Sequence, residues 1–486
     1  MPLKKNPSLK VFFITAEADP FIKVGGLGDY AGSLPKALLN TDPALLDGYT
    51  LDLRLAIPFH SAINPKKFNL RQLGKVGIQF NKKILSLDIF FTKVNGLIIY
   101  LIKNHLYFND NEPVYSSDQL HNRIKYTIFS LACLELAKQL KWQVDILHAN
   151  DWHTSLAIVK IKQQKKRESF FKDTRTVLSV HNMGYMGGSH KYLLKEFGLK
   201  PVAHPQIPTW AKDQPMPMGL ILSDLLIAVS PTYAKEIQTS KFGYGMERFL
   251  RTRKQSITGI LNGIDYQKWN PKTDMCVVKS YSVETINDRR INKNDLQKSL
   301  CLEANPSIPL IAIISRLDFQ KGIDLAIKAM VRMRELPWQL VILGTGSQEL
   351  ENLCQKFAKN NPDRVRTLIS YNDKIARQMY ASADMILIPS RYEPCGTTQM
   401  IAMRYGCLPL ARATGGLKDS IKHLSNGFLF VKSTTNSLIL AITDALYLFI
   451  NNPRHWRKMQ DNAMRKDFTW TISAKEYLLN YLRLMN

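Results

Sequence analysis

The chain has 486 residues, of which 45% are hydrophobic and 22% are charged, a composition that predicts a globular protein and excludes a disordered one. This length exceeds one ordinary hydrophobic core, so two or three domains are expected. The formal net charge of +26 is high. The densest basic run, Lys165-Lys166-Arg167, has no interleaved aromatic residues, which argues against nucleic acid as a partner.

The sequence also bears on the compartment. No apolar stretch approaches the roughly 20 residues that cross a membrane. The first apolar run is too short for the core of a secretion signal. The six cysteines are scattered and lack the spacing of a zinc site. We therefore expect a cytoplasmic protein with reduced thiols and no membrane partner.

Short apolar runs alternate with amphipathic segments in the first half of the chain. A long helix is expected over residues 123–140, and alternation over residues 71–105 indicates inserted strands or a hairpin. Directly after the first strand, Gly25-Gly26-Leu27-Gly28-Asp29 can bring the backbone close to a ligand and open a helix whose N–H groups favour an anion. The strands are expected at residues 11–15, 52–57, 144–148, 176–180 and 225–229.

The polar, proline-punctuated residues 270–309 indicate a connection, after which the pattern restarts. A second Gly-Gly-Leu-x-Asp turn stands at residues 415–419. Strands that alternate with helices predict parallel sheets covered on both faces, with ligands at the carboxyl ends of the strands. We therefore expect an α/β fold of two Rossmann-like domains facing a central cleft. In this half, strands are expected at residues 310–314, 339–343 and 385–389, and helices at residues 322–334 and 397–405.

Three basic residues stand where they could hold a diphosphate. Arg316 and Lys321 lie five residues apart in the loop before the helix that starts at Gly322, so both could reach one ligand. Lys23 precedes the first glycine turn and is the matching cation of the other domain. Isolated loop cations are more often simply solvated, whereas the surrounding pattern favours function here.

Six motifs follow one another along the chain. They are Lys23-Val24-Gly25-Gly26-Leu27-Gly28-Asp29, His148-Ala149-Asn150-Asp151-Trp152-His153-Thr154, His181-Asn182-Met183-Gly184-Tyr185, Gly259-Ile260-Leu261-Asn262-Gly263-Ile264-Asp265, Ser315-Arg316-Leu317-Asp318-Phe319-Gln320-Lys321-Gly322 and Glu393-Pro394-Cys395-Gly396. In this order they resemble the motifs of bacterial glycogen synthases and plant starch synthases. The resemblance covers nearly the whole chain, and the ordered set is far more specific than any one motif.

The resemblance implies a glycosyltransferase of the GT-B type. Such an enzyme transfers glucose from ADP-glucose, or from UDP-glucose, to the 4-OH of an α-1,4-glucan or maltooligosaccharide, with retention at the anomeric carbon. It assigns residues 1–265 to an acceptor-side domain, residues 266–465 to a donor domain and residues 466–486 to a C-terminal helix that packs on the first domain. The nucleotide sugar is a co-substrate. No further cofactor and no metal is expected, because the sequence has no HExxH, Asp-x-Asp or Cys/His cluster.

The same resemblance assigns roles to individual residues. In the family's retaining chemistry the leaving phosphate helps to deprotonate the acceptor on the same face of the sugar. Glu393 would then orient the glucosyl unit and stabilise its developing positive charge. The residues expected to act in catalysis are Glu393, His181, Arg316, Lys321 and Asp29. Those expected to bind substrate are Lys23, Gly25, Gly26, Asp151, Asn182, Cys395, Gly396, Thr397, Thr398 and Tyr371.

The residues alone leave structural interpretations open beside these roles. Glu393, followed by Pro394, could cap the first turn of the helix that runs to Tyr405. The segment Asp151-Trp152-His153 could equally be a buried, hydrogen-bonded turn. Cys395 has no neighbouring base to activate it and is better interpreted as a buried packing residue.

The chain departs from the family at two places on the acceptor side. Tyr185-Met186-Gly187 stands where the family has Tyr-Gln-Gly, and residues 214–219 lack a basic residue usual there. Both changes bear on acceptor affinity or chain length more than on donor chemistry. Two alternatives therefore stay open: a related glycosyltransferase with another acceptor, and a glucan-binding homologue without turnover.

Overall fold

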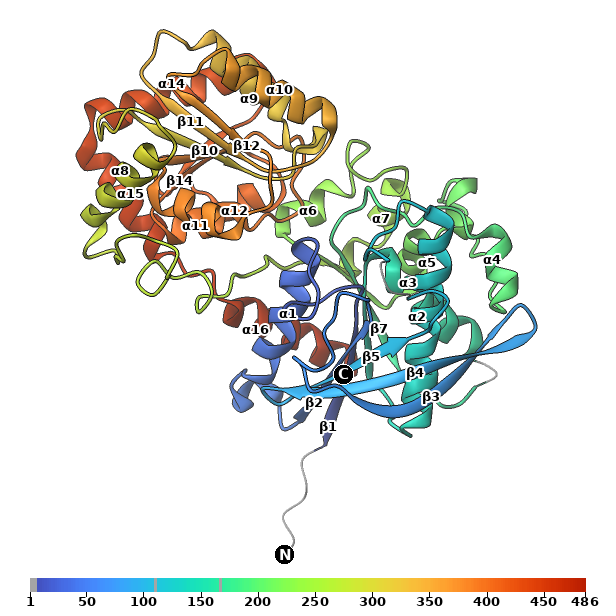
Figure 1. Ribbon diagram of the computed structural model, residues 1–486. Helices are drawn as coiled ribbons and strands as arrows, with labels where there is room; N and C mark the ends of the chain where they lie inside the picture. Colours follow the sequence, from blue (N-terminus) through green and yellow to red (C-terminus); the bar gives the residue numbers. More distant parts are fainter. Residues whose placement is uncertain (1–6, 109–111, 166–167) are drawn as a thin grey trace, which may run out of the picture. The chain divides into compact units, whose positions relative to one another are not determined.

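The computed structural model describes residues 7–108, 112–165 and 168–486 (Figure 1). Lys166 and Arg167 of the basic run lie outside these described residues. The chain divides into two compact units. The N-terminal unit comprises the chain up to Gly263 together with Trp470–Asn486, and the C-terminal unit comprises Ile264–Thr469.

Within the described residues, the N-terminal unit is built on a nine-stranded sheet with the order β3-β4-β5-β2-β1-β6-β7-β8-β9. The strands β3 (Arg71–Phe80) and β4 (Lys83–Val94) form an antiparallel hairpin, and β4 also pairs antiparallel with β5, which confirms the strands predicted over residues 71–105. Residues 11–14 of β1 are at most 1% exposed, as expected for the centre of a parallel sheet. The parallel strands are β1 (Ser8–Ile14), β2 (Thr50–Pro58), β5 (Leu97–Lys103), β6 (Ile146–Asn150), β7 (Arg175–Val180), β8 (Leu225–Ala228) and β9 (Ile257–Gly259).

Helices pack against this sheet and against one another. One helix pair is formed by the first and last helices of the unit, and a second group is formed by α2, α3 and α5. The α-helices are α1 (Gly26–Leu39), α2 (Gln119–Gln139), α3 (Asp151–Gln164), α4 (Lys191–Glu196), α5 (Pro215–Leu222), α6 (Pro231–Glu236), α7 (Glu247–Thr252) and α16 (Trp470–Met485). Short 3₁₀ turns lie at Pro43–Leu46, Thr209–Asp213 and Lys254–Ser256.

The C-terminal unit has a parallel sheet whose order in the described chain is β12-β11-β10-β13-β14-β15. Its strands are β10 (Leu310–Ile314), β11 (Gln339–Leu343), β12 (Val365–Leu368), β13 (Met385–Ile388), β14 (Leu408–Arg412) and β15 (Phe428–Phe430). Its α-helices are α8 (Arg289–Ser299), α9 (Ile323–Arg332), α10 (Gln348–Lys359), α11 (Asp373–Ser382), α12 (Thr398–Arg404), α13 (Gly415–Ser420), α14 (Thr435–Asn451) and α15 (Pro453–Arg465), with 3₁₀ turns at Ile286–Asp288 and Phe319–Lys321. The predicted α/β class with two parallel-sheet units is confirmed.

One local prediction is wrong within the C-terminal unit. The connection predicted over residues 270–309 contains the helix α8. Apart from Leu296, its inward positions are polar: Lys293 and Gln297 are buried, and Lys293 Nζ lies 2.7 Å from a carboxylate oxygen of Asp384. Because hydrogen-bonding side chains fill the buried positions, α8 has little of the apolar periodicity that marks a helix in sequence.

The helix predicted over residues 397–405 is confirmed as α12, whereas the interpretation of Glu393 as a cap in its first turn is wrong. The helix expected from residue 397 begins at Thr398, so Glu393 lies in the preceding loop and not in the first turn. Gly396 has a φ of +73°, and Gln399 Nε2 donates to the carbonyl of Gly396 at 2.9 Å. The left-handed backbone at this glycine stops the helix from extending further toward Glu393.

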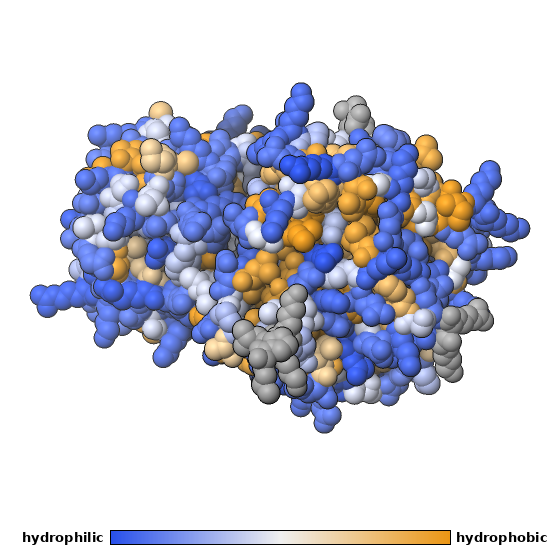
Figure 2. Space-filling model, turned by 90° about the horizontal axis from the view of Figure 1, so that it is seen from below, coloured by the Kyte–Doolittle hydropathy of each residue, from blue (hydrophilic) through white to orange (hydrophobic). Residues whose placement is uncertain are grey.

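Figure 2 shows one face of the molecule, on which hydrophilic side chains predominate and hydrophobic ones gather in patches between them. This polar face accords with the composition, in which 22% of the residues are charged. Within the described ranges, none of the helices combines the length and apolarity needed to cross a membrane.

A buried hydrogen-bonded network ties α16 to the rest of the N-terminal unit. The hydroxyl of Tyr481 lies 2.6 Å from Nδ1 of His148, whose Nε2 lies 2.7 Å from the hydroxyl of Ser179. The hydroxyl of Tyr30, on α1, lies 3.1 Å from those of Ser179 and Tyr477. Burial lowers the pKa of His148 to about 3. The imidazole is therefore neutral, and its two nitrogens serve as one donor and one acceptor.

We expect Tyr481→Phe to lower the free energy of unfolding by about 1–3 kcal/mol, because it leaves Nδ1 of the buried His148 without its partner. Tyr192→Phe removes the same group from a side chain that is 80% exposed and is the matched control. Its effect should stay within about 0.5 kcal/mol. Denaturant unfolding of the two variants and the wild type measures the difference, and equal effects would contradict the network's contribution.

Candidate active site

The glycine turn of the N-terminal unit follows β1 and opens α1. Gly25 precedes the helix, and Gly26 is its first residue. Lys23 and Asp29 form an ion pair across the turn, with Nζ and Oδ2 2.6 Å apart. A Cβ atom on Gly26 would have nothing within 4 Å, so the backbone at this residue can be approached closely by a ligand.

The carboxyl ends of β6 and β7 bring a second group together. Oδ1 of Asp151 accepts hydrogen bonds from the backbone N–H groups of His181, at 2.7 Å, and Asn182, at 3.4 Å. Asp151 has a φ of +53°, an uncommon conformation for a residue with a side chain. Burial raises the pKa of its carboxyl to about 7, although the two N–H groups oppose that change. The Asp151 side chain thus supports the loop that carries His181.

The protonation of His181 follows from its surroundings. Loss of hydration lowers its pKa to about 3, so the ring is neutral at physiological pH. Its Nε2 lies 3.0 Å from Oδ1 of Asn150, an atom that can only accept. The proton therefore sits on Nε2, and Nδ1 carries the accepting lone pair. The ring also packs edge-on against Tyr30, with 4.4 Å between centroids, which connects it to α1 and the glycine turn.

In the C-terminal unit, the loops after β10 and β13 meet at an ion pair. These strands are neighbours in the sheet. Nζ of Lys321 lies 2.6 Å from Oε2 of Glu393, whose side chain is buried. The hydroxyl of Ser390 donates to the same oxygen at 3.0 Å, and Asp318 accepts the backbone N–H of Lys321 at 3.1 Å. Both members of the pair are therefore held by further hydrogen bonds.

The second glycine turn packs against the backbone beside Glu393. A Cβ atom on Gly415, where φ is +43°, would lie 1.9 Å from the carbonyl oxygen of Glu393. One on Gly416 would lie 2.2 Å from the carbonyl oxygen of Cys395. The N–H of Gly416 also donates toward the carbonyls of Glu393 and Pro394, at 3.2 Å each. Only glycine permits this approach, which fixes the segment that carries Glu393.

The remaining predicted residues of this unit do not take part in the ion pair between Lys321 and Glu393. Arg316 pairs with Asp318 at 3.0 Å, and its side chain is 57% exposed. Tyr371 lies before α11 and is 82% exposed. Cys395 is buried, in agreement with a packing residue. The others, which lie at or just before the start of α12, are Gly396, Thr397 and Thr398.

The structure brings together some predicted residues and adds others. Lys23 meets Asp29, Asp151 meets His181 and Asn182, and Lys321 meets Glu393. The sequence reasoning missed Glu17, Ser390 and Tyr30, which contact these residues or the loops that carry them. Their positions in the sequence could have identified two of them. Glu17 stands between a predicted strand and a glycine turn, and Ser390 stands directly after a predicted strand.

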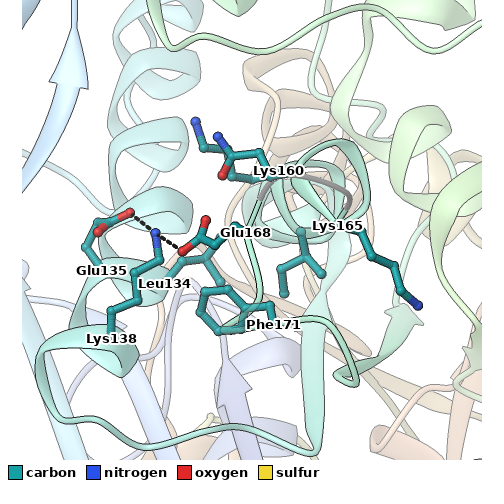
Figure 3. A pocket seen from close by; sticks show the side chains of 9 residues that line it. Leu134, Glu135, Lys138, Lys160, Lys165, Glu168 and Phe171 are labelled. Carbon is teal, nitrogen blue, oxygen red and sulfur yellow. Dashed lines mark hydrogen bonds and ion pairs between the residues drawn. The ribbon is translucent and has the colours of Figure 1, made fainter.

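Among the described residues, no group of three or more His, Cys, Asp and Glu side chains is placed to hold a metal ion. A separate small pocket lies over α2, α3 and the segment after α3 (Figure 3). In it, Nζ of Lys138 lies 2.9 Å from Glu135 and 2.6 Å from Glu168. The pocket contains none of the predicted site residues. Its lining residues are Leu134, Glu135, Lys138, Lys160, Ile161, Gln164, Lys165, Glu168 and Phe171.

Comparison with known families agrees with this arrangement of two units. Residues 10–252 match the family model of the starch synthase catalytic domain, and residues 302–466 match that of group 1 glycosyl transferases. Two α/β units with parallel sheets, each matching a glycosyltransferase model, define a glycosyltransferase of the GT-B type.

Individual relatives narrow this class. The chain is 37% identical to a glycogen synthase of Thermosipho melanesiensis, over 98% of this chain and 99% of the relative, and 36% identical to one of Clostridium perfringens, over 98% of each. The catalytic domain of starch synthase IV from Arabidopsis thaliana, solved with ADP and acarbose, superposes with a TM-score of 0.88 at 31% identity, over 98% of this chain and 99% of that one. A sucrose-phosphate synthase of Thermosynechococcus elongatus shares the fold alone, with a TM-score of 0.62 at 18% identity and 99% coverage of both chains. The chain belongs to the family of glycogen and starch synthases, which are glucosyltransferases.

The raised pKa of Asp151 predicts a pH dependence of stability. An ordinary aspartate titrates at 3.8, whereas burial raises the pKa of Asp151 in the folded protein to about 7. The folded state therefore binds this proton more tightly. The resulting stability is fully present below about pH 4 and is lost as the pH rises through about 7. Asp151→Asn keeps an acceptor for the His181 N–H but does not titrate. Between pH 5 and pH 8, the melting temperature of the variant should therefore rise relative to the wild type.

Thermal unfolding at pH 5, 6, 7 and 8 and constant ionic strength measures this difference. Asp151→Ala removes the titration and the acceptor together, so it should be less stable than Asp151→Asn at every pH. A difference between wild type and Asp151→Asn that does not change with pH would show that the carboxyl is not titrating in this range.

Proposed function

We propose that the protein is a glycogen synthase that transfers glucose from ADP-glucose to the non-reducing 4-OH of an α-1,4-glucan, with retention, in the cytoplasm. The observation that carries the proposal is the ion pair between Lys321 and Glu393, at the adjoining ends of β10 and β13. It occurs in a chain that belongs to the glycogen and starch synthase family over nearly its whole length.

The donor side of the reaction requires positive charge. When a nucleoside diphosphate leaves the anomeric carbon, negative charge builds on the phosphate at the breaking bond. Arg316 offers a planar fork of donors and Lys321 a compact ammonium group, and both stand in the loop after β10. Thr397 and Thr398 can add hydroxyl and backbone donors to the phosphates. Lys23 supplies a further cation from the N-terminal unit.

The transferred glucose carries the opposite charge in the transition state. Positive charge develops at the anomeric carbon and ring oxygen, and the carboxylate of Glu393 can stabilise it. Lys321 and Ser390 both donate to Oε2 of Glu393, so the carboxylate is oriented before substrate arrives. Neither donor need leave the carboxylate for Glu393 to act in this way, because the role is electrostatic and involves no bond to the sugar.

The N-terminal unit contributes polar groups for the sugars. Neutral His181 has its accepting lone pair on Nδ1, which suits a hydrogen bond from a sugar hydroxyl and adds no charge. Asp151 fixes the loop of His181 and Asn182 through their backbone N–H groups. Asp29 stands beside Lys23 and offers a carboxylate to the acceptor.

The preferred base of the donor is proposed from the relatives. The Arabidopsis thaliana starch synthase IV structure contains ADP, which favours ADP-glucose over UDP-glucose. Incubation with each donor and short maltooligosaccharides tests both the function and this choice. Release of nucleotide with glucan lengthening, at a higher kcat/KM for ADP-glucose, is the expected result. Release without lengthening would indicate another acceptor, and glucan binding without release would indicate a homologue that does not turn over.

We expect Glu393→Ala and Lys321→Ala each to lower kcat by a factor of roughly 10²–10⁴, because each removes charge that is needed mainly in the transition state. Lys328→Ala, which removes a 67% exposed lysine of α9, is the matched control and should leave kcat near the wild-type value. Steady-state kinetics measures kcat of the three variants, and circular dichroism checks that each of them is folded. Near-wild-type turnover in either site variant would remove that residue from the proposed mechanism.

A further inference from the structure

A carboxylate lies inside the glycine turn of the N-terminal unit. The side chain of Glu17 is 1% exposed. Its Oε2 accepts the backbone N–H of Gly25 at 3.2 Å and also the N–H of Val24. Its Oε1 accepts the hydroxyl of Tyr115, which lies between β5 and α2, at 2.9 Å. Both oxygens therefore have partners, and two of those partners belong to the turn.

The backbone of Glu17 is itself fixed to the sheet. It follows β1 by three residues, and the N–H of Thr15 donates to the carbonyl of Ala56 at 3.1 Å. Nε2 of His60 lies 2.8 Å from the carbonyl oxygen of Ala16. Because the segment before Glu17 is anchored in this way, the carboxylate is the fixed partner and the turn is the part that it holds.

The same carboxylate contributes to the position of Lys23. A Cβ atom on Gly28 would lie 3.0 Å from Oε2 of Glu17 and 3.0 Å from Cγ of Lys23. The aliphatic part of Lys23 and the carboxylate thus pack against one glycine, and Nζ of Lys23 reaches Asp29 at 2.6 Å. A side chain at residue 28, or a shift of the carboxylate, would displace Lys23.

The contacts of Glu17 separate this turn from an ordinary phosphate-binding turn. The N–H groups of Val24 and Gly25 already face a carboxylate, so a phosphate beside them would be repelled by a charge of the same sign. Gly26, in contrast, has open space beside it. What the turn offers an anionic ligand is therefore the ammonium group of Lys23 together with the open backbone at Gly26.

We propose that Glu17 is a positioning residue for the nucleotide-sugar donor: it fills the turn of residues 23–29 from the inside and fixes Lys23 where the donor phosphates bind. This inference rests on the function proposed above, in which Lys23 contacts the donor. Glu17 touches neither substrate nor reacting atoms and acts through the backbone of Val24 and Gly25.

Two substitutions separate positioning from a need for negative charge. Glu17→Gln keeps an oxygen that accepts from Val24 and Gly25, and its amide can donate to the hydroxyl oxygen of Tyr115. It should retain kcat/KM for the donor within about threefold. Glu17→Met has a similar size but no acceptor, so it should lower kcat/KM by a factor on the order of 10², the usual effect of a misplaced binding group. A loss with Glu17→Gln as large as with Glu17→Met would overturn the positioning role.

A double-mutant cycle tests whether Glu17 affects kcat/KM through the position of Lys23. If Glu17 acts by placing Lys23, then Glu17→Met in a Lys23→Met background should lower kcat/KM no more than about threefold further. Thr174→Val is the control for plain destabilisation, because it removes a buried hydroxyl that donates to the carbonyl of Val144 at 2.7 Å in the same unit. The factors by which Thr174→Val and Lys23→Met each lower kcat/KM should multiply in the double variant. Multiplicative effects of Glu17→Met and Lys23→Met would overturn the proposal.

Hydrogen exchange provides a readout that does not depend on activity. Glu17→Met should accelerate exchange of the Val24 and Gly25 amides, whereas Glu17→Gln should leave it close to wild type. If the wild-type protein transferred no glucose, the proposed function would fail while the exchange rates still decided whether Glu17 holds the turn. Unchanged exchange in a folded Glu17→Met variant would show that it does not.

Discussion

Acidic side chains that accept backbone N–H groups hold the loops at the carboxyl ends of the strands. Glu17 accepts from the turn that carries Lys23, Asp151 accepts from the loop that carries His181, and Asp318 accepts from the N–H of Lys321. Loops that leave a parallel sheet have donors without regular partners, and buried donors must be satisfied. In this protein the residues that satisfy them also determine where the functional side chains lie.

The second organising feature is the pairing of each proposed donor-binding cation with a carboxylate. Lys23 lies against Asp29, Arg316 against Asp318 and Lys321 against Glu393. A carboxylate beside a flexible cation limits the conformations that the long side chain samples, and so reduces the entropy lost when a phosphate binds. The pairs are not equivalent, because Glu393 is buried whereas the side chain of Arg316 is largely exposed. We infer that Lys321 is the most precisely placed of the three.

The sequence predicts the architecture well because buried parallel strands form short apolar runs, and these runs alternate with helices along the chain. Most strands of the two sheets and the inserted hairpin were recognisable in this way, whereas β9, β12, β14 and β15 were not predicted. The helix α8 was not, because its buried positions hold Lys293 and Gln297 and show little apolar periodicity. Site residues such as Lys321 and Glu393 could be named from sequence, but the residues that support them could not. A carboxylate such as Glu17 bonds to backbone N–H groups, which every residue except proline possesses, so no residue pattern identifies its partner.

The repeated Gly-Gly-Leu-x-Asp turn shows the same limit. Identical letters occupy different surroundings: the first turn surrounds the side chain of Glu17, whereas Gly415 and Gly416 lie against the backbone of residues 393–395. A glycine requirement can arise from a ligand, a side chain or a main chain, and sequence does not distinguish these. The three cases are distinguished in the structure by the atoms that a Cβ at each glycine would contact.

The membership of α16 in the N-terminal unit has a consequence for how the protein is made. This unit is interrupted in sequence by the whole C-terminal unit, and its last helix is translated after Thr469. Nascent chains begin to fold from their N-terminal parts. The contacts of His148 with Tyr481 and of Tyr30 with Tyr477 therefore cannot form until the more than two hundred residues of the C-terminal unit have been translated. The C-terminal unit has no such dependence, and its sheet can be completed before the older part of the chain has acquired its final core.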